Sequence, residues 1–378
     1  MKKYSYFKKL SIVFCVFIFA IACFDFLTPP KEFSETENRA LNQMPKVSWN
    51  SIEEGRFQKH LEQYINDQFI LKDLWVRLKV GVDFLRGKPE SQGVYNGRSG
   101  FLLEKFIDVS DKDRDKTVNS IAGVRKMKNN IEVNALIAPT AVNVLENKLP
   151  MAAPKSNQDE YMDYLFKNLE AKGIKTIDVR KSFKGSENKE DLYYKGDHHW
   201  TNEGVKKAVK KTIRPLDIKA DKNGFEDLIV SNTFEGSLKS KSGYYGGPKD
   251  KIYVGRPTKK VPKTVITYVE ESKKTACFFD TKKLNEKDQY QVFMGGNHGV
   301  VKIKSTTANK KNLLIIKDSY GNSFIPYVAP YFKTTTVIDP RYFYGDISKV
   351  IRNNGIDKVL FVYNANTIAT DTSIRTLS

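Results

Sequence analysis

Cysteine is scarce in this chain, which has three cysteines among its 378 residues. Cys15 and Cys23 fall in an apolar run near the N-terminus, so Cys277 is the one cysteine left in the body of the chain. A single thiol can form neither an internal disulfide nor a cysteine metal site. Stability must therefore come from a hydrophobic core, and a chain of this length can bury one.

Acidic residues are also few relative to basic ones. Asp and Glu number 44 against 63 Lys and Arg, which leaves a formal net charge of +19 and indicates an anionic neighbour. The basic residues are spread along the chain in pairs such as Lys206-Lys207 and Lys210-Lys211, and no zinc-finger, homeodomain or RNP pattern accompanies them. We therefore expect no nucleic-acid partner, and a membrane surface or an anionic cell wall fits the charge at least as well.

The N-terminus predicts export. Lys2, Lys3, Lys8 and Lys9 precede an apolar run over residues 10–24, which Asp25 ends. A basic segment before about 15 apolar residues is typical of a signal peptide or short signal anchor, with the rest of the chain outside the cell. A lipoprotein signal that ends at Cys23 is a third possibility beside a cleaved signal peptide and an uncleaved anchor. We expect an uncleaved anchor over residues 1–30, hence a single-anchored protein of the cell membrane whose main domain is extracytoplasmic.

The next segment, residues 31–90, is predicted to be a linker followed by amphipathic helix. Phe57, Leu61, Ile65 and Phe69 recur every four residues, and the apolar pattern then changes register from Leu71 onward, which indicates a bend or two helices. Turn signals within residues 94–104 predict a hairpin at the start of the main domain, which spans residues 91–378.

Alternating strands and helices make up most of that domain. Short apolar runs predict strands at 133–139, 174–179, 312–318, 334–339 and 358–364, and helical patterns cover 158–171 and 201–213. Such alternation predicts an α/β fold with a mainly parallel sheet covered on both faces. Residues 220–310 instead read as a β-rich insertion, with strands expected at "KIYVG", "KTVITYV", "KTACFF" and "YQVFM".

Two segments carry residues suited to chemistry. The first, "YYKGDHHWTNEG", places Asp197, His198 and His199 just before a helix, and the chain has only four histidines. The second, "LLIIKDSYGNSF", places Asp318 and Ser319 where a buried strand turns toward the next helix. In open parallel sheets, sites form at the carboxyl ends of strands, where both segments are expected to lie.

Acyl transfer would use these residue types. A serine hydroxyl needs a base within hydrogen-bond reach, histidine can take and return that proton, and a carboxylate on the other ring nitrogen holds the imidazole in place. Asp197 and His199 are two residues apart, as an extended loop requires for such a pair. The Ser319 amide near a helix N-terminus would supply part of an oxyanion hole.

Each assignment has a structural alternative. Asp197, His198 and His199 could instead bind a metal, but adjacent imidazoles usually point apart and only two other histidines remain, so neither a metal nor a cofactor is expected. Ser319 could simply cap a helix, and Asp318 is expected to be structural. Trp200 is interpreted as a packing residue or as a wall that stacks on a sugar.

The chain resembles the DHHW family. The resemblance rests on "GDHHW" and on further motifs in order along the chain: "SETENRAL", "GRSGFLL", "FEGSL", "FMGGNHGVVKI", "KDSYGNSFIPYV" and "IDPRYF". This family is similar to the alginate O-acetylation proteins AlgJ and AlgX, which have an SGNH-hydrolase-like fold with the acid–histidine pair before the serine. That order holds here.

The resemblance implies an Asp-His-Ser triad at Asp197, His199 and Ser319, and substrate contacts at Tyr320 and Arg341. It also implies a membrane-bound O-acyltransferase as partner. The chain departs from ordinary SGNH hydrolases at Lys317, which stands where the GDS block has glycine. A further oxyanion donor is expected at Gly296-Asn297, with Asn297 as the side chain, and the alternative is that this segment is a plain turn.

The resulting hypothesis is O-acetyl transfer to a cell-surface or secreted polysaccharide. An esterase that uses water as acceptor would have the same triad. A non-catalytic, glycan-binding scaffold of an export complex would be expected to have lost it.

Overall fold

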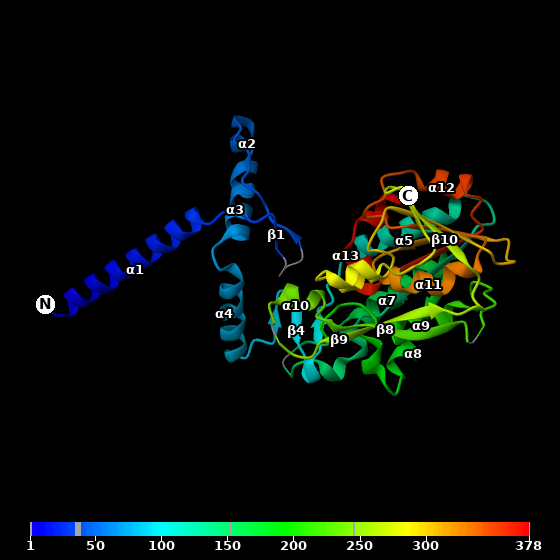
Figure 1. The fold of residues 1–378 in the computed structure, drawn as a ribbon, viewed down its shortest axis with the longest axis horizontal. Coiled ribbons are helices and arrows are strands. Elements are labelled where there is room, and N and C mark those ends of the chain that lie inside the picture. Colours follow the sequence, from blue (N-terminus) through cyan, green and yellow to red (C-terminus); the bar gives the residue numbers. More distant parts are fainter. Residues whose placement is uncertain (1, 35–38, 152, 222, 245, 378) are drawn as a thin grey trace. The chain divides into compact units, whose positions relative to one another are not determined.

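The computed structural model describes residues 2–34, 39–151, 153–221, 223–244 and 246–377. Residues 35–38 of the predicted linker, and with them part of "SETENRAL", lie outside the described residues. The chain divides into two units, residues 1–88 with 243–245, and residues 89–242 with 246–378. Each unit is described separately below (Figure 1).

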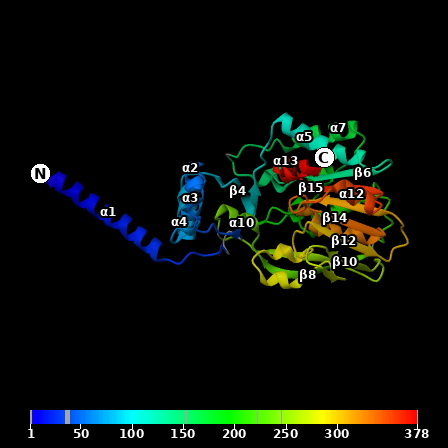
Figure 2. The same cartoon turned by 90° about the horizontal axis from the view of Figure 1, so that it is seen from above.

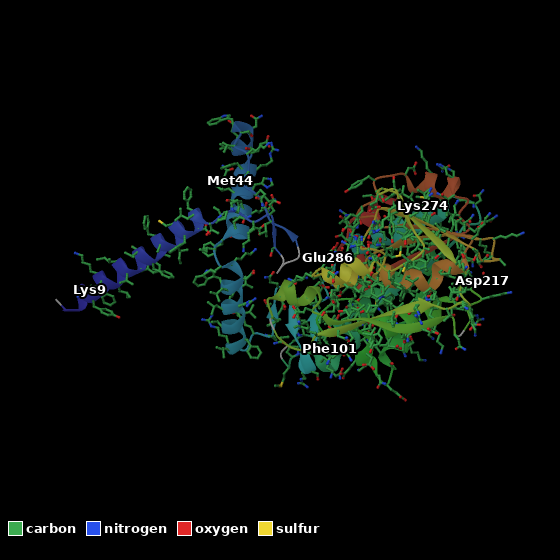
Figure 3. All side chains as sticks on the ribbon, in the orientation of Figure 1. Lys9, Met44, Phe101, Asp217, Lys274 and Glu286 are labelled. Atoms are coloured by element: carbon green, nitrogen blue, oxygen red, sulfur yellow. The ribbon has the colours of Figure 1, made fainter. Side chains whose placement is uncertain are left out.

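The first unit consists mainly of helices. Its elements are α1 (Lys2–Leu27), β1 (Phe33–Ser34), β2 (Arg39–Ala40), α2 (Trp49–Glu53), α3 (Arg56–Gln68) and α4 (Lys72–Leu85). In the described part of the chain, α1 alone is long and apolar enough to cross a membrane, through its segment Tyr6–Leu27. Figure 3 shows the side chains of this helix, with Lys9 labelled. The change of register after Phe69 is a break between two helices, because Leu71 adopts a positive φ of 53° before α4 begins.

The second unit is built on an eight-stranded sheet with the order β11-β10-β12-β14-β13-β15-β6-β7. The five strands from β14 to β7 are parallel, whereas β12, β10 and β11 extend one edge by antiparallel pairing. Figure 2 shows this succession from β6 through β15, β14 and β12 to β10. The strands are β6 (Glu132–Ala138), β7 (Lys175–Asp178), β10 (Thr264–Tyr268), β11 (Lys273–Thr275), β12 (Val300–Ser305), β13 (Asn312–Lys317), β14 (Thr334–Ile338) and β15 (Lys358–Asn364).

Helices cover both faces of this sheet, as the alternating pattern predicts. The connection from β6 to β7 through α7 and that from β13 to β14 through α11 run in opposite directions across the sheet, so right-handed crossovers place the two helices on opposite faces. The helices are α5 (Asp111–Lys126), α6 (Ala141–Val144), α7 (Gln158–Ala171), α8 (Arg180–Lys184), α9 (Asn202–Thr212), α10 (Ser237–Ser242), α11 (Tyr320–Val328), α12 (Ile347–Asn353) and α13 (Ala365–Thr370).

The core follows from the apolar runs of the sequence. Strand β13 is buried from Leu313 to Lys317 and β15 is buried along its whole length, as central strands covered on both faces must be. Side chains fill the space between the ribbons of this unit (Figure 3). The α/β fold class is therefore confirmed.

The β-rich region has a different layout from the one expected. A separate ribbon forms from β8 (Phe225–Phe234) and β9 (Asp250–Pro257), but β10, β11 and β12 join the main sheet. The strand expected at "YQVFM" is wrong: Gln289–Val292 is a 3₁₀ turn. Its apolar residues are buried in a small cluster against the β8–β9 ribbon, so their hydrophobicity reflects burial without a strand. A three-stranded sheet, β3 (Glu90–Ser91), β4 (Val94–Asn96) and β5 (Leu102–Glu104), contains the predicted hairpin.

Candidate active site

Ser319 lies at the carboxyl end of the central strand β13, directly before α11. The turn is held by the buried carboxylate of Asp318, which accepts hydrogen bonds from the Tyr320 amide (2.9 Å) and from the amide and side chain of Asn364 at the end of β15 (2.9 and 2.6 Å). Burial raises the pKa of Asp318 to about 6. Asp318 is thus a structural residue that fixes the direction in which Ser319 leaves the sheet.

Asp197 and His199 lie on a tight loop between Tyr193 and Trp200, which form an antiparallel bridge. Asp250, at the start of β9, supports this loop by accepting hydrogen bonds from the amides of Lys195 (3.0 Å) and Gly196 (2.8 Å). The β8–β9 region therefore contributes directly to the position of the loop.

Two glycines let a second segment approach the loop closely. A Cβ on Gly196 would lie 2.3 Å from the carbonyl oxygen of Glu235, and one on Gly236 would lie 2.4 Å from the carbonyl oxygen of Gly196. Gly236 also has a positive φ of 75°, which glycine adopts without strain. This approach explains why glycine stands in both "GDHHW" and "FEGSL", and it brings the next residue, Ser237, against Asp197.

The side chains of Asp197, His199 and Ser319 form one continuous hydrogen-bonded chain. His199 Nδ1 lies 2.5 Å from Asp197 Oδ1, and His199 Nε2 lies 2.7 Å from Ser319 Oγ. Asp197 Oδ1 also accepts from the His199 amide (2.9 Å), and Asp197 Oδ2 accepts from the Ser237 amide (2.7 Å). Asp197 and His199 are buried, whereas Ser319 is partly exposed, so the hydroxyl is the member of the chain that a substrate can reach.

Electrostatics fixes the direction of these hydrogen bonds. Asp197 is buried, but His199, His198 and the Ser237 amide outweigh that burial and lower its pKa well below the ordinary range, so it is a carboxylate at neutral pH. Burial, assisted by the positive charge of His198, lowers the pKa of His199 to about 4, against the opposing pull of Asp197. A neutral imidazole facing a carboxylate must keep its proton on Nδ1, so Nε2 accepts and the Ser319 hydroxyl donates.

Aromatic residues surround the imidazole. The Tyr290 ring stacks on His199 with centroids 3.6 Å apart, and the Tyr290 hydroxyl reaches Ser323 Oγ at 2.9 Å. Trp200 is fully buried, and its Nε1 also donates to Ser323 Oγ (2.9 Å). This burial corrects the suggestion that Trp200 forms a wall for a sugar, because no face of the indole is open to one.

Tyr320 is buried as well. Its hydroxyl donates to the His198 carbonyl oxygen at 2.5 Å, and its amide is bonded to Asp318. A direct substrate contact by its side chain would require the loop to move, whereas the observed hydrogen bond joins the first turn of α11 to the histidine loop.

Polar residues form a second group beside the start of α11. Asn297 Oδ1 accepts from Lys317 Nζ (3.0 Å) and from Asn322 Nδ2 (2.9 Å), and Lys317 also pairs with the buried Asp339 (3.0 Å). Arg341 pairs with the same carboxylate through two hydrogen bonds of 2.8 and 2.6 Å and is itself partly exposed. Burial lowers the pKa of Lys317, and the negative charge of the neighbouring Asp339 opposes this shift.

A metal is the alternative occupant of the loop. Ligand atoms of Asp197, His198 and His199 lie within 4.8 Å of one another. The expectation that adjacent imidazoles point apart is wrong here, since the two rings are 3.8 Å apart between centroids. Even so, both nitrogens of His199 and both oxygens of Asp197 are already hydrogen-bonded, and His198 Nδ1 faces Ser237 Oγ at 2.7 Å. A metal would have to displace these contacts, so the donor set fits a triad better than an ion.

The structure thus brings together residues that are 120 positions apart in the sequence. Asn297 and Arg341 lie close to the strand that carries Ser319, through Lys317 and Asp339. Sequence reasoning missed Tyr290 and Ser237 as neighbours of the triad, and it did not place Lys317 in a network. The motifs "FEGSL" and "KDSYGNSFIPYV" contain Ser237 and Lys317, and they were the available signal for those two.

Solved structures with a similar fold are known. The chain is similar to a DHHW family protein from Eubacterium siraeum, with 21% identity, a TM-score of 0.65 and coverage of 76% of this chain and 96% of that chain. It is also similar to PatB1 of Bacillus cereus, with 19% identity, a TM-score of 0.63 and coverage of 75% and 99%. The O-acetyltransferase domain of Pseudomonas putida AlgJ matches with 14% identity, a TM-score of 0.48 and coverage of 74% and 93%.

At such identities the likenesses to the Eubacterium siraeum protein and to PatB1 establish a shared fold. No curated protein sequence matches the chain. The sequence profile of the DHHW protein family matches residues 90–338, about two thirds of the chain, and this stretch contains Asp197, His199 and Ser319. The chain therefore belongs to the DHHW family.

Proposed function

We propose that this chain is an extracytoplasmic O-acetyltransferase that acts on a cell-surface or secreted polysaccharide through Ser319, His199 and Asp197. The observation that supports it most directly is the unbroken hydrogen-bonded path from Asp197 Oδ1 through His199 to Ser319 Oγ. A serine that only capped α11 would bond the amides of that helix, whereas no side-chain cap bond is formed by Ser319.

In the first step, Ser319 Oγ attacks the carbonyl carbon of an acetyl donor while its proton passes to His199 Nε2. Asp197 stabilises the resulting imidazolium, which then protonates the leaving group as the bond from the carbonyl carbon to that group breaks. The product is acetyl-Ser319. His199 is neutral at physiological pH because burial lowers its pKa, so it is ready to act as the base in this step.

In the second step, a sugar hydroxyl attacks the acetyl carbon as His199 Nε2 takes its proton, and Ser319 Oγ leaves and recovers that proton. The negative charge on the carbonyl oxygen needs hydrogen-bond donors in both steps. The Ser319 amide, which has no acceptor in the described part of the chain, and the side-chain amide of Asn297 are the proposed donors. Arg341 is the proposed contact for the acyl donor or glycan.

The polysaccharide and the acetyl donor would meet this site outside the cell. We propose that α1 anchors the chain in the membrane and that a membrane-bound O-acyltransferase supplies acetyl groups.

The test uses the full-length chain in detergent. A chromogenic acetyl ester should be hydrolysed, and Ser319→Ala and His199→Ala should each lower kcat by at least about 10³-fold, as loss of a triad member does elsewhere. Ser110→Ala, a serine at the start of another helix, and His60→Ala are the matched controls and should keep full activity. Retention of activity in both triad variants would refute the assignment.

Two further measurements separate the alternatives. A sulfonyl fluoride should attach to Ser319 with loss of fluoride, and mass spectrometry of the digested protein should locate it there; the PatB1 structure with a sulfonyl adduct makes this reagent a natural choice. When an oligosaccharide is added to the reaction, its acetylated form should appear among the products. Free acetate alone would identify an esterase, and absence of both labelling and turnover would favour a glycan-binding scaffold.

A further inference from the structure

Lys317 is a buried lysine two residues before the proposed nucleophile. Its side chain is 3% exposed, under the first turn of α11. Gly321 makes room for it: a Cβ at Gly321 would lie 2.6 Å from Lys317 Cβ and 2.9 Å from its Cγ. Lysine is almost never buried without a partner, because removing its charge from water is costly. The packing around Lys317 therefore depends on glycine at position 321, where a side chain on α11 would displace the lysine.

The partners of the ammonium group determine how Asn297 is oriented. Lys317 Nζ donates to Asn297 Oδ1 and to Asp339 Oδ2, each at 3.0 Å. An ammonium group has donors only, so the atom of Asn297 that faces it must be the oxygen. An asparagine side chain held by neutral groups could be turned over and still find partners, whereas a lysine accepts only one of the two orientations.

Asn322 supports the same orientation. Its Nδ2 donates to Asn297 Oδ1 at 2.9 Å, while its own Oδ1 is buried without a hydrogen-bond partner among the described residues. An unpaired buried acceptor typically costs about 1–3 kcal/mol. Turning the Asn322 amide over would direct its oxygen at the Asn297 oxygen and would remove one of the two donors. Lys317 and Asn322 therefore both donate to the Asn297 oxygen, although this arrangement leaves the Asn322 oxygen unpaired.

With its oxygen held in this way, Asn297 directs its N–H groups away from Lys317 and Asn322. Asn297 Nδ2 makes no hydrogen bond within the described chain and the residue is partly exposed. Lys317 and Asn322 are the residues two before and three after Ser319, so the two residues that hold the Asn297 oxygen flank the nucleophile in the chain.

We propose that Lys317 is a positioning residue that fixes the orientation of the Asn297 side chain, so that an N–H group rather than a carbonyl oxygen faces the acyl oxygen formed at Ser319. This inference rests on the proposed function, in which Asn297 is an oxyanion donor. The opposite orientation would place a partial negative charge beside a developing oxyanion and raise the barrier. A lysine at this position, in place of the glycine of the GDS block, thus has a role in the reaction.

The experiment measures acetyl-ester hydrolysis by the full-length chain in detergent. Asn297→Ala should lower kcat by about 10²- to 10³-fold, the effect of losing one oxyanion donor. Lys317→Met, of similar length but without donors, should lower kcat by roughly 10- to 100-fold and leave KM within about threefold. In the Asn297→Ala background, Lys317→Met should change kcat by less than about threefold, because no amide remains to be oriented.

The matched control is Lys358→Met. Lys358 is equally buried, with 3% of its side chain exposed, and it pairs with Asp217 and Glu132 at the opposite end of the sheet strands. Its removal should cost stability, measured as Tm, without a comparable loss of kcat. If Lys317→Met does not fold, Gly321→Ala is the second variant, since alanine suits a helix and displaces the Lys317 side chain.

The outcomes separate the two proposals. Full activity in Asn297→Ala would remove Asn297 from the oxyanion hole and with it this role for Lys317, while the triad variants would still test the proposed function. A loss in Asn297→Ala with none in Lys317→Met or Gly321→Ala would overturn the positioning role alone. Equal effects of Lys317→Met with and without Asn297 would also overturn it, because the lysine would then act through stability.

Discussion

The imidazole ring of His199 lies flat on the phenol ring of Tyr290, with centroids 3.6 Å apart and planes inclined by 8°. Tyr290 belongs to a 3₁₀ turn of the β-rich region, and its hydroxyl is anchored by Ser323 on α11. The ring therefore limits the tilt of the imidazole between Asp197 and Ser319. A residue that touches neither substrate nor proton can in this way govern how often His199 Nε2 points at Ser319 Oγ.

We expect Tyr290→Phe to keep kcat within about threefold of wild type, because the stacked ring remains. Tyr290→Ala should lower kcat by roughly 10- to 100-fold, since a small misplacement of a catalytic group is costly, and should lower the free energy of unfolding by about 3–5 kcal/mol. Ester hydrolysis and denaturant unfolding measure the two effects. Tyr161→Ala, in the core against α5, is the control: it should lose stability without a matching loss of kcat.

The pH dependence of kcat/KM should have a low acid limb. His199 acts as a base only when neutral, and burial together with the charge of His198 lowers its pKa to about 4. Activity should therefore rise as pH increases through about 4 and stay level through neutral pH. His198→Gln removes a neighbour whose charge lowers the pKa of His199, so the limb should move to higher pH. An unmoved limb in this variant would show that the charge of His198 does not reach His199.

Asp318 should make stability depend on pH in the opposite sense to most carboxylates. Burial raises its folded pKa from 3.8 to about 6, so between these values the folded chain holds a proton that the unfolded chain releases. Its contribution favours folding at low pH and is lost as pH rises through about 6, a difference of about 3 kcal/mol. Denaturant unfolding of wild type and Asp318→Asn across this range checks it: their stability difference should change with pH, and a constant difference would contradict the assignment.

Gly236→Ala should disturb the triad from a distance. The new Cβ would lie 2.4 Å from the Gly196 carbonyl oxygen and 2.6 Å from Asp197 Cβ, at a φ of 75°. We expect a loss of about 2–4 kcal/mol in unfolding free energy from strain and overpacking, together with a fall in kcat. Gly246→Ala is the control, because Gly246 also has a positive φ but a Cβ there would meet open space. This variant should lose only the stability that backbone strain costs, and its kcat should be unchanged.

Local patterns were sufficient to predict the elements that lie in regular layers. Residues 158–171 have an apolar stripe at helical spacing and form α7 with the same bounds, and the buried runs at 312–318 and 358–364 form β13 and β15. Such elements are predictable because their burial repeats with the period of the backbone. The helix break after Phe69 was visible for the same reason, as a change in that period.

The environment of the site depended on contacts that no local period reveals. Tyr290 looked like a strand residue because it lies in an apolar run, yet its partners are His199 and Ser323, which come from other parts of the chain. Trp200 could equally have faced a sugar or the core, and only its packing against α11 decided for the core.

By itself, the sequence determined the residue types of the candidate site, their order along the chain and the strand–loop–helix setting of Ser319, because these depend on composition and on local hydrophobic period. Tertiary structure decided that Asp197, His199 and Ser319 meet, that Tyr290 stacks on the imidazole and that Lys317 faces the oxygen of Asn297. The reason is physical: hydrogen bonds and ring stacking act over a few ångströms, so only the packed sheet and its loops can bring such distant residues within reach.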